Sequence, residues 1–145
     1  KFEIWALSTF WGSDNRTELE KRVISSINWV GDGIHTTEKD IKVVKCVIGL
    51  EVLFKIPVEG KQRRFIKNVA KLFEPHVKNS DLIRKHAKKI YKLRSAIVHR
   101  GKQDITDEDA ELSERLASGC LLRVLGKMDD FSTEEDFDNW LNSDD

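Results

Sequence analysis

The sequence predicts an all-α fold, a helical bundle of four main helices with short additional helices. Apolar residues recur at three- and four-residue spacing along most of the chain, which is the period of an amphipathic helix. Runs of alternating apolar and polar residues, the pattern of a half-buried strand, are not found in the sequence. A chain of 145 residues can bury a core of its own, so we expect a single domain with its core over about 14–128.

The first two predicted helices span about 14–31 and about 37–55. Asp14 or Asn15 can cap the first, because a side-chain oxygen at this position accepts a hydrogen bond from a free backbone amide of the first turn. Its apolar residues recur at helical spacing until Gly-Asp-Gly at 31–33, which we expect to end it. The segment Thr-Thr-Glu-Lys-Asp is typical of a helix start and precedes the second.

The next two predicted helices span about 60–73 and about 81–99, and both are rich in lysine and arginine. In the third helix the apolar residues form one face and the basic residues the other, and Pro75 ends it. Gly101 follows the fourth helix. Glycine is common there because it tolerates the positive φ that terminates many helices.

The fifth predicted helix starts at Thr106 and runs to about Met128. A short acidic helix over about 133–141 follows, within an acidic C-terminal extension of residues 129–145. Met128 is the only methionine, so the chain lacks an initiator and we expect it to be a fragment of a longer polypeptide.

The net charge of zero hides a strong asymmetry along the chain. Residues 1–54 carry 7 basic and 8 acidic side chains, and residues 55–102 carry 15 basic against 3 acidic. Residues 103–145 carry only 3 basic against 14 acidic. The basic block is either a binding surface for a polyanion or a surface that the acidic third covers and neutralises. The sequence leaves both readings open.

Two features narrow the class of protein. No apolar run approaches the roughly 20 residues that span a bilayer, and the N-terminal segment lacks the apolar stretch and cleavage site of a signal peptide. Cys46 and Cys120 lie in apolar helical patterns without the spacing of a zinc site, so we expect two buried, reduced thiols. We therefore expect a cytoplasmic protein with no membrane segment, no metal and no cofactor.

One segment, Tyr-Lys-Leu-Arg-Ser-Ala-Ile-Val-His-Arg-Gly at 91–101, carries candidate catalytic residues. Arg94 and His99 lie five positions apart and project about 140° from one another on a helix, whereas Ser95 and His99 share a face. Histidine can move a proton at a reacting oxygen, and arginine can hold a phosphate. Together they suit metal-free cleavage of RNA, which carries the attacking 2′-hydroxyl. The alternative is a solvated basic helix end.

The segment resembles the signature of HEPN domains, in particular of the Apea-like HEPN group. A tyrosine precedes the arginine, a small polar residue follows it, two apolar residues precede the histidine, and a glycine lies just beyond. Val-Ile-Gly-Leu-Glu-Val-Leu-Phe at 47–54 and Asn-Val-Ala-Lys-Leu-Phe at 68–73 are similar to the second and third helices of this family. The similarity covers about residues 15–125.

The resemblance implies a bundle that forms a homodimer, in which Arg94 and His99 of two protomers build one metal-independent ribonuclease site. HEPN ribonucleases occur in toxin–antitoxin and antiviral defence systems, so a regulatory domain or an antitoxin-like partner is also expected. Ser95 stands where many members carry Asn, Asp or His. Other members keep the fold without cleavage, as dimerisation or nucleic-acid-binding modules of larger proteins, and this alternative stays open.

Two residues near the motif are candidates for supporting roles. Glu51 could pair with Arg94 or orient His99, or it could pair with Lys55 one helical turn away. Tyr91 could stack on a base or brace Arg94, or it could pack with its hydroxyl at the surface.

Basic residues around the motif are candidates for RNA binding, and the alternative for each is an ordinary exposed charge. Arg100 and Lys102 flank the end of the fourth helix, and Lys85, Lys88, Lys89 and Lys92 lie along it.

Overall fold

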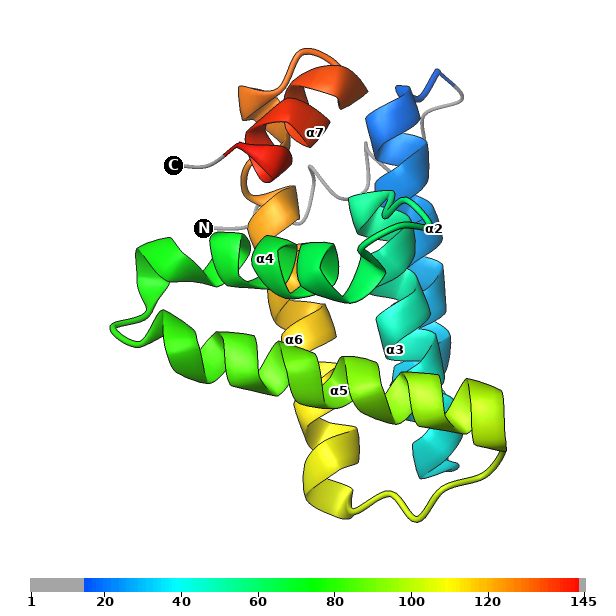
Figure 1. The fold of residues 1–145 in the computed structure, drawn as a ribbon. Helices are drawn as coiled ribbons and strands as arrows, with labels where there is room; N and C mark the ends of the chain where they lie inside the picture. Colours follow the sequence, from blue (N-terminus) through cyan, green and yellow to red (C-terminus); the bar gives the residue numbers. More distant parts are fainter. Residues whose placement is uncertain (1–14, 144–145) are drawn as a thin grey trace.

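The computed structural model describes residues 15–143, and all regular structure in this range is helical (Figure 1). The predicted all-α bundle is therefore confirmed. The α-helices are α2 (Glu18–His35), α3 (Lys39–Phe54), α4 (Lys61–Phe73), α5 (Ser80–Arg100), α6 (Asp107–Leu125) and α7 (Glu134–Asn142), with short 3₁₀ helices η1 (Glu74–His76) and η2 (Met128–Asp130). None of these helices is both long enough and apolar enough to cross a membrane.

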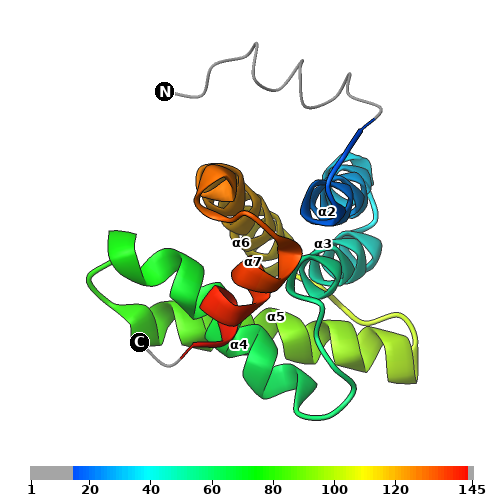
Figure 2. The ribbon, with the colours of Figure 1, turned by 90° about the horizontal axis from the view of Figure 1, so that it is seen from above.

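The helices form two groups that cross one another. Helices α2, α3 and α6 run side by side, while α4 and α5 form an antiparallel pair that crosses α3 and α6 (Figure 1). Viewed from above, α2 lies on the far side of the molecule from α4 and α5 (Figure 2). Phe65 of α4 is fully buried where the two groups meet, with its ring 6.0 Å from that of Phe54 and 5.2 Å from that of Tyr91.

Several helix ends follow the predicted chemistry. Thr106 and Thr133 cap α6 and α7, each accepting a hydrogen bond from the backbone amide three residues on. Gly101 ends α5 with φ of 83°. The start of α2 differs, because Thr17 forms a reciprocal capping box with Glu20 in place of Asn15. The other predicted cap, Asp14, lies outside the described residues.

The glycines at 31–33 do not end the first helix, which continues to His35. Gly33 is buried against α3, and a Cβ there would lie 3.2 Å from the Sγ atom of Cys46. Gly49 of α3 is packed more tightly still, because a Cβ would lie 2.6 Å from Val30. A glycine costs about 1 kcal/mol in a helix relative to alanine. Here the close approach of α2 and α3 outweighs that cost.

The core extends beyond the expected limit at about 128. Phe137 and Leu141 of α7 are both fully buried, so the acidic C-terminal extension is part of the domain up to Leu141. Arg22 of α2 holds α7 in place, with hydrogen bonds to Glu134 at 3.0 Å and to Asp138 at 2.6 Å.

Both cysteines are buried and unbridged, as predicted. Burial raises the pKa of Cys46 to about 11, and burial likewise raises the pKa of Cys120. A thiol with a raised pKa stays protonated at neutral pH and is a poor nucleophile. The cysteines therefore serve as packing residues.

Candidate functional site

The predicted catalytic motif lies in the last three turns of α5. Asn79 caps the other end of this helix, and the amide of Gly101 donates to the carbonyl of Ile97 at 2.9 Å. Arg94 and His99 therefore both lie in regular helix, which fixes the angle between their side chains. The positive φ of Gly101 turns the chain away and leaves His99 exposed.

Arg94 points to α3, where it pairs with Glu51. Its Nη2 atom lies 2.9 Å from the carboxylate, and the two side chains are only 18% and 16% exposed. Lys55, the other partner considered for Glu51, instead pairs with Glu134 of α7 at 2.8 Å. The pair thus joins α3 to α5 across the crossing of the two helix groups.

The pair between Arg94 and Glu51 is incompletely satisfied. The Nε atom of Arg94 and the Oε1 atom of Glu51 are both buried, and neither has a hydrogen-bond partner among the described residues. A buried polar atom without a partner costs about 1–3 kcal/mol. Such atoms are rare in folded proteins, and they mark a place where a ligand or a rearrangement could supply the missing bond.

Tyr91 belongs to the core beside this pair. The residue is 8% exposed, and its ring packs against Phe65. Burial raises the pKa of the Tyr91 hydroxyl, and the Glu51 carboxylate raises it further, while Arg94 acts in the opposite direction. The small exposed part of Tyr91 lines the same surface hollow as His99, and the stacking role considered for Tyr91 stays a prediction.

His99 lines a surface hollow of about 450 Å³ between α5 and the start of α4. Ser95, one turn earlier on α5, lines the same hollow, as their shared helix face predicts. The other residues around it are Gln62, Tyr91, Lys92, Ala96 and Arg100. Arg94 is not among them. Within one chain the structure therefore separates the two predicted catalytic side chains.

Gln62 is the residue of this hollow that sequence reasoning missed. It comes from α4 and meets α5 only because the two helices pack as an antiparallel pair. No local pattern in the sequence marks a single glutamine as a neighbour of a histidine on another helix. The basic outer face of the third predicted helix was the one available signal that this part of α4 borders the site.

The predicted RNA-binding lysines divide into two kinds. Lys85, Lys88 and Lys92 are exposed, and their spacing continues through Ser95 to His99 along one face of α5. Lys89 lies off this stripe and pairs with Asp109 of α6 at 2.6 Å, and this hydrogen bond raises the pKa of its ammonium group. Lys102 is exposed beyond the helix end and does not line the hollow.

The acidic third of the chain folds back mainly onto α2 and α3. Its ion pairs with the other two thirds, in the described range, are Arg22 with Glu134 and Asp138, Lys39 with Asp107, Lys42 with Glu114, Lys55 with Glu134, and Lys89 with Asp109. Only the last two reach residues 55–102. In the described range the acidic third therefore pairs mostly with α2 and α3, and each of the two readings of the charge asymmetry is met in part.

The site therefore combines an exposed histidine and a half-buried serine with several cations on one face, and a half-buried arginine on another. The histidine can exchange protons with a ligand in the hollow, and the cations favour an anionic one. Comparisons of the chain with protein-family models, with curated proteins and with solved structures gave no significant match.

Proposed function

We propose that the chain is a metal-independent RNA endonuclease of the HEPN kind, active as a homodimer. The observation that carries this proposal is the separation of the two side chains in one protomer. His99 is exposed in the hollow, while Arg94 lies outside it against Glu51. A second copy related by twofold symmetry can bring the two motifs into one cleft, which a single helix cannot do.

The reaction is an internal transesterification. The 2′-oxygen of RNA forms a bond to the adjacent phosphorus, and the bond from phosphorus to the 5′-oxygen breaks. His99 of one protomer takes the 2′ proton, and His99 of the other gives a proton to the leaving 5′-oxygen. Arg94 offsets the charge on the phosphate. The products are a 2′,3′-cyclic phosphate and a 5′-hydroxyl.

The surface around His99 supports association of two copies. Val98, the residue before it, is 52% exposed and offers an apolar contact next to His99. A symmetric contact through the end of α5 would cover Val98 and bring the two hollows together. We place the proposed enzyme in a defence or toxin-type system, under the control of a regulatory domain or an antitoxin-like partner.

The alternative is a non-catalytic HEPN module for dimerisation or nucleic-acid binding. The ion pair between Arg94 and Glu51 favours it, because an arginine held by a carboxylate of its own chain is not available to a phosphate. In the catalytic reading Arg94 must leave Glu51, or share its buried Nε atom with the substrate.

The test is RNA cleavage in excess EDTA by the wild type, His99→Ala and Arg94→Ala, with the fragment ends mapped. Removal of the general acid–base group should lower the rate by about 10²–10⁴. His86→Ala, on the same helix but outside the hollow, is the matched control and should cleave like the wild type. Equal cleavage by all variants, or none by the wild type, would overturn the proposal.

Mixing wild-type protein with His99→Ala tests the composite site. Because the reaction uses His99 of both protomers, a heterodimer of the two chains lacks one of the two proton-transfer groups. Random exchange of subunits at equal amounts should therefore lower the activity of the wild-type protein to about half of its value without the variant. If one chain acts alone, mixing leaves the wild-type activity unchanged.

A further inference from the structure

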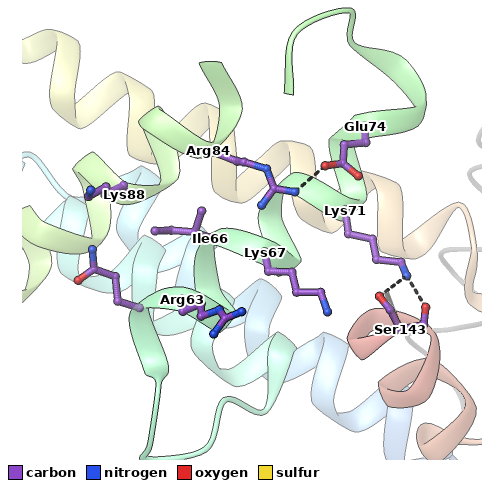
Figure 3. A pocket seen from close by; sticks show the side chains of 9 residues that line it. Arg63, Ile66, Lys67, Lys71, Glu74, Arg84, Lys88 and Ser143 are labelled. Atoms are coloured by element: carbon purple, nitrogen blue, oxygen red, sulfur yellow. Dashed lines mark hydrogen bonds and ion pairs between the residues drawn. The ribbon is translucent and has the colours of Figure 1, made fainter. Parts of the chain in front are cut away.

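A second hollow of about 690 Å³ lies between α4 and α5, beside the one that holds His99 (Figure 3). Cations from both helices line it, together with Ile66 and Gln62 and with Ser143 at one end. The basic residues are Arg63, Lys67, Lys71, Arg84 and Lys88, and the acidic residue of the lining within 15–143 is Glu74.

The groove cations differ in how they are bound. Glu74 is occupied by Arg84, at 2.7 Å. Lys67 and Lys71 each donate at 3.1 Å to a main-chain carbonyl at the end of α7. Arg63 and Lys88 are exposed, and neither has an acidic partner within residues 15–143. These two cations, one on each wall, give the groove its capacity for an anion.

The groove continues into the hollow at the catalytic motif. Gln62 lines both. Lys88 of the groove and Lys92 of the hollow are one helical turn apart on the same face of α5, and Arg100 lies beyond His99. With a rise of about 1.5 Å per residue, Lys88 and His99 are about 16 Å apart along the helix axis. Cations therefore follow the whole path from Arg63 to His99.

We infer that this groove binds the sugar-phosphate backbone of single-stranded RNA and leads it to His99, an inference that rests on the proposed function. Phosphates along the strand contact Arg63, Lys88 and Lys92 in turn. Among residues 15–143, the one aromatic residue in the lining of the groove and the hollow is the largely buried Tyr91, so contacts to phosphates carry the proposed binding. A single strand can also rotate its 2′-oxygen into line with the scissile bond, which a regular duplex cannot.

Figure 3 shows Ser143 at one end of the groove, where its carbonyl and its hydroxyl oxygen accept hydrogen bonds from Lys71. The carbonyl of Asn142 accepts a hydrogen bond from Lys67 at 3.1 Å. The groove therefore runs from the end of α7 toward the catalytic motif.

The experiment measures binding separately from cleavage. A fluorescein-labelled oligouridylate is titrated with His99→Ala protein in EDTA over a series of salt concentrations, and affinity is followed by fluorescence anisotropy. The groove variant adds Arg63→Gln and Lys88→Gln. Each lost phosphate contact on a single strand lowers the slope of log affinity against log salt by about 0.7, so we expect a decrease of about 1.4.

The matched control carries Lys21→Gln and Lys39→Gln, which change the net charge equally on α2 and α3. It should keep the slope of its parent. The proposal that the groove binds RNA would be wrong if the parent and the groove variant had equal salt slopes. It would also be wrong if the slope of the control decreased as much as that of the groove variant. A duplex RNA probe that binds as tightly as the single strand would overturn the single-strand assignment.

The two proposals fail in different ways. If the wild type never cleaves RNA but the groove variant loses binding, the groove stands and the nuclease reading falls. If the wild type cleaves while the Arg63→Gln, Lys88→Gln protein with intact His99 binds and cleaves equally well, the nuclease reading stands and the groove falls.

Discussion

Two arginines join helices in this molecule, and they are satisfied to very different degrees. Arg22 has a side chain only 7% exposed, yet all its nitrogens are bound. Its Nε atom donates to the carbonyl of Leu53 at 2.7 Å, its other two nitrogens donate to carboxylates of α7, and its guanidinium lies 5.3 Å from the ring of Phe137. Arg94 is 18% exposed and makes one bond, to Glu51.

The difference distinguishes a structural arginine, Arg22, from Arg94, whose pairing with Glu51 does not use all of its N–H donors. A guanidinium has five N–H donors in a fixed fork, and Arg22 uses that geometry fully against two carboxylates and a carbonyl. Within residues 15–143, the Nε atom of Arg94 has no hydrogen-bond partner, and neither has the Oε1 atom of Glu51. In the proposed function, a phosphate would supply the missing partner of this Nε atom.

The largest expected effect on stability comes from Arg22→Met. The change leaves Asp138 without a cation, leaves Glu134 with Lys55 alone, and removes the bond to Leu53, so we expect a loss near the lower end of the about 3–5 kcal/mol typical of a broken buried pair. The carboxylates are about a quarter exposed, which limits the loss. Urea unfolding followed by circular dichroism measures it.

Arg22→Lys is the matched control for this prediction. Lysine keeps the positive charge but lacks the planar, forked set of N–H donors of the guanidinium. The free energy of unfolding of Arg22→Lys should therefore lie between those of the wild type and Arg22→Met. If Arg22→Met lowers the free energy of unfolding by less than about 1 kcal/mol, the ion pairs of Arg22 are no stronger than ordinary surface pairs. The contrast drawn between Arg22 and Arg94 would then be wrong.

The second prediction concerns Arg94 and Glu51 as a pair. Arg94→Met should cost about 1–3 kcal/mol, because it leaves a buried carboxylate unpaired. The double variant with Glu51→Leu as well should recover most of that loss, since two apolar side chains can replace an imperfect ion pair at little cost. Unfolding free energies of the two single variants and the double variant complete the cycle.

A double variant as destabilised as the sum of the single ones would contradict this reading. In that case the pair would be as structural as the contacts of Arg22, and the unpaired atoms would carry no functional meaning. RNA cleavage by the same variants keeps the two questions apart, because activity should be lost in both variants that lack Arg94.

The sequence predicted the helices because their determinants are local. Apolar spacing, the caps at Thr106 and Thr133, and Gly101 each act within one turn or two. The predicted end of the first helix was too early. Gly33 is accommodated in the helix by its close contact with α3, and a local sequence pattern does not reveal that contact. The low helix propensity of glycine had less influence on the end of this helix than the packing of Gly33 against α3.

The candidate site shows the same division. The motif predicted that Ser95 and His99 share a face and that Arg94 points elsewhere, since both statements follow from helix geometry. Neither the bond from Arg22 to α7 nor the place of Gln62 could be read from the chain, because the partners are far apart in sequence. The choice between Arg94 and Lys55 as partner of Glu51 also required the packing of α3 against α5.

The smallest expected effect is a pH dependence of the free energy of unfolding that arises at the contact between Arg22 and α7. The hydrogen bond from Lys55, with help from Arg22, lowers the pKa of Glu134 below its ordinary value of 4.5. A carboxyl whose pKa is lower in the folded state contributes stability above the unfolded value, and this contribution is lost as the pH falls through the folded value. The wild type should therefore be more stable than Glu134→Gln at pH 7.

That advantage should shrink as the pH falls below about 4.5 and vanish in stronger acid, as the carboxyl becomes protonated in both states. Urea unfolding of the two proteins across this range measures the difference directly. Glu135→Gln, at the next and exposed position of α7, is the control and should track the wild type. A constant difference between wild type and Glu134→Gln would mean that Glu134 acts through packing or a neutral hydrogen bond. The charge complementarity assigned to the Arg22 side would then rest on Asp138 alone.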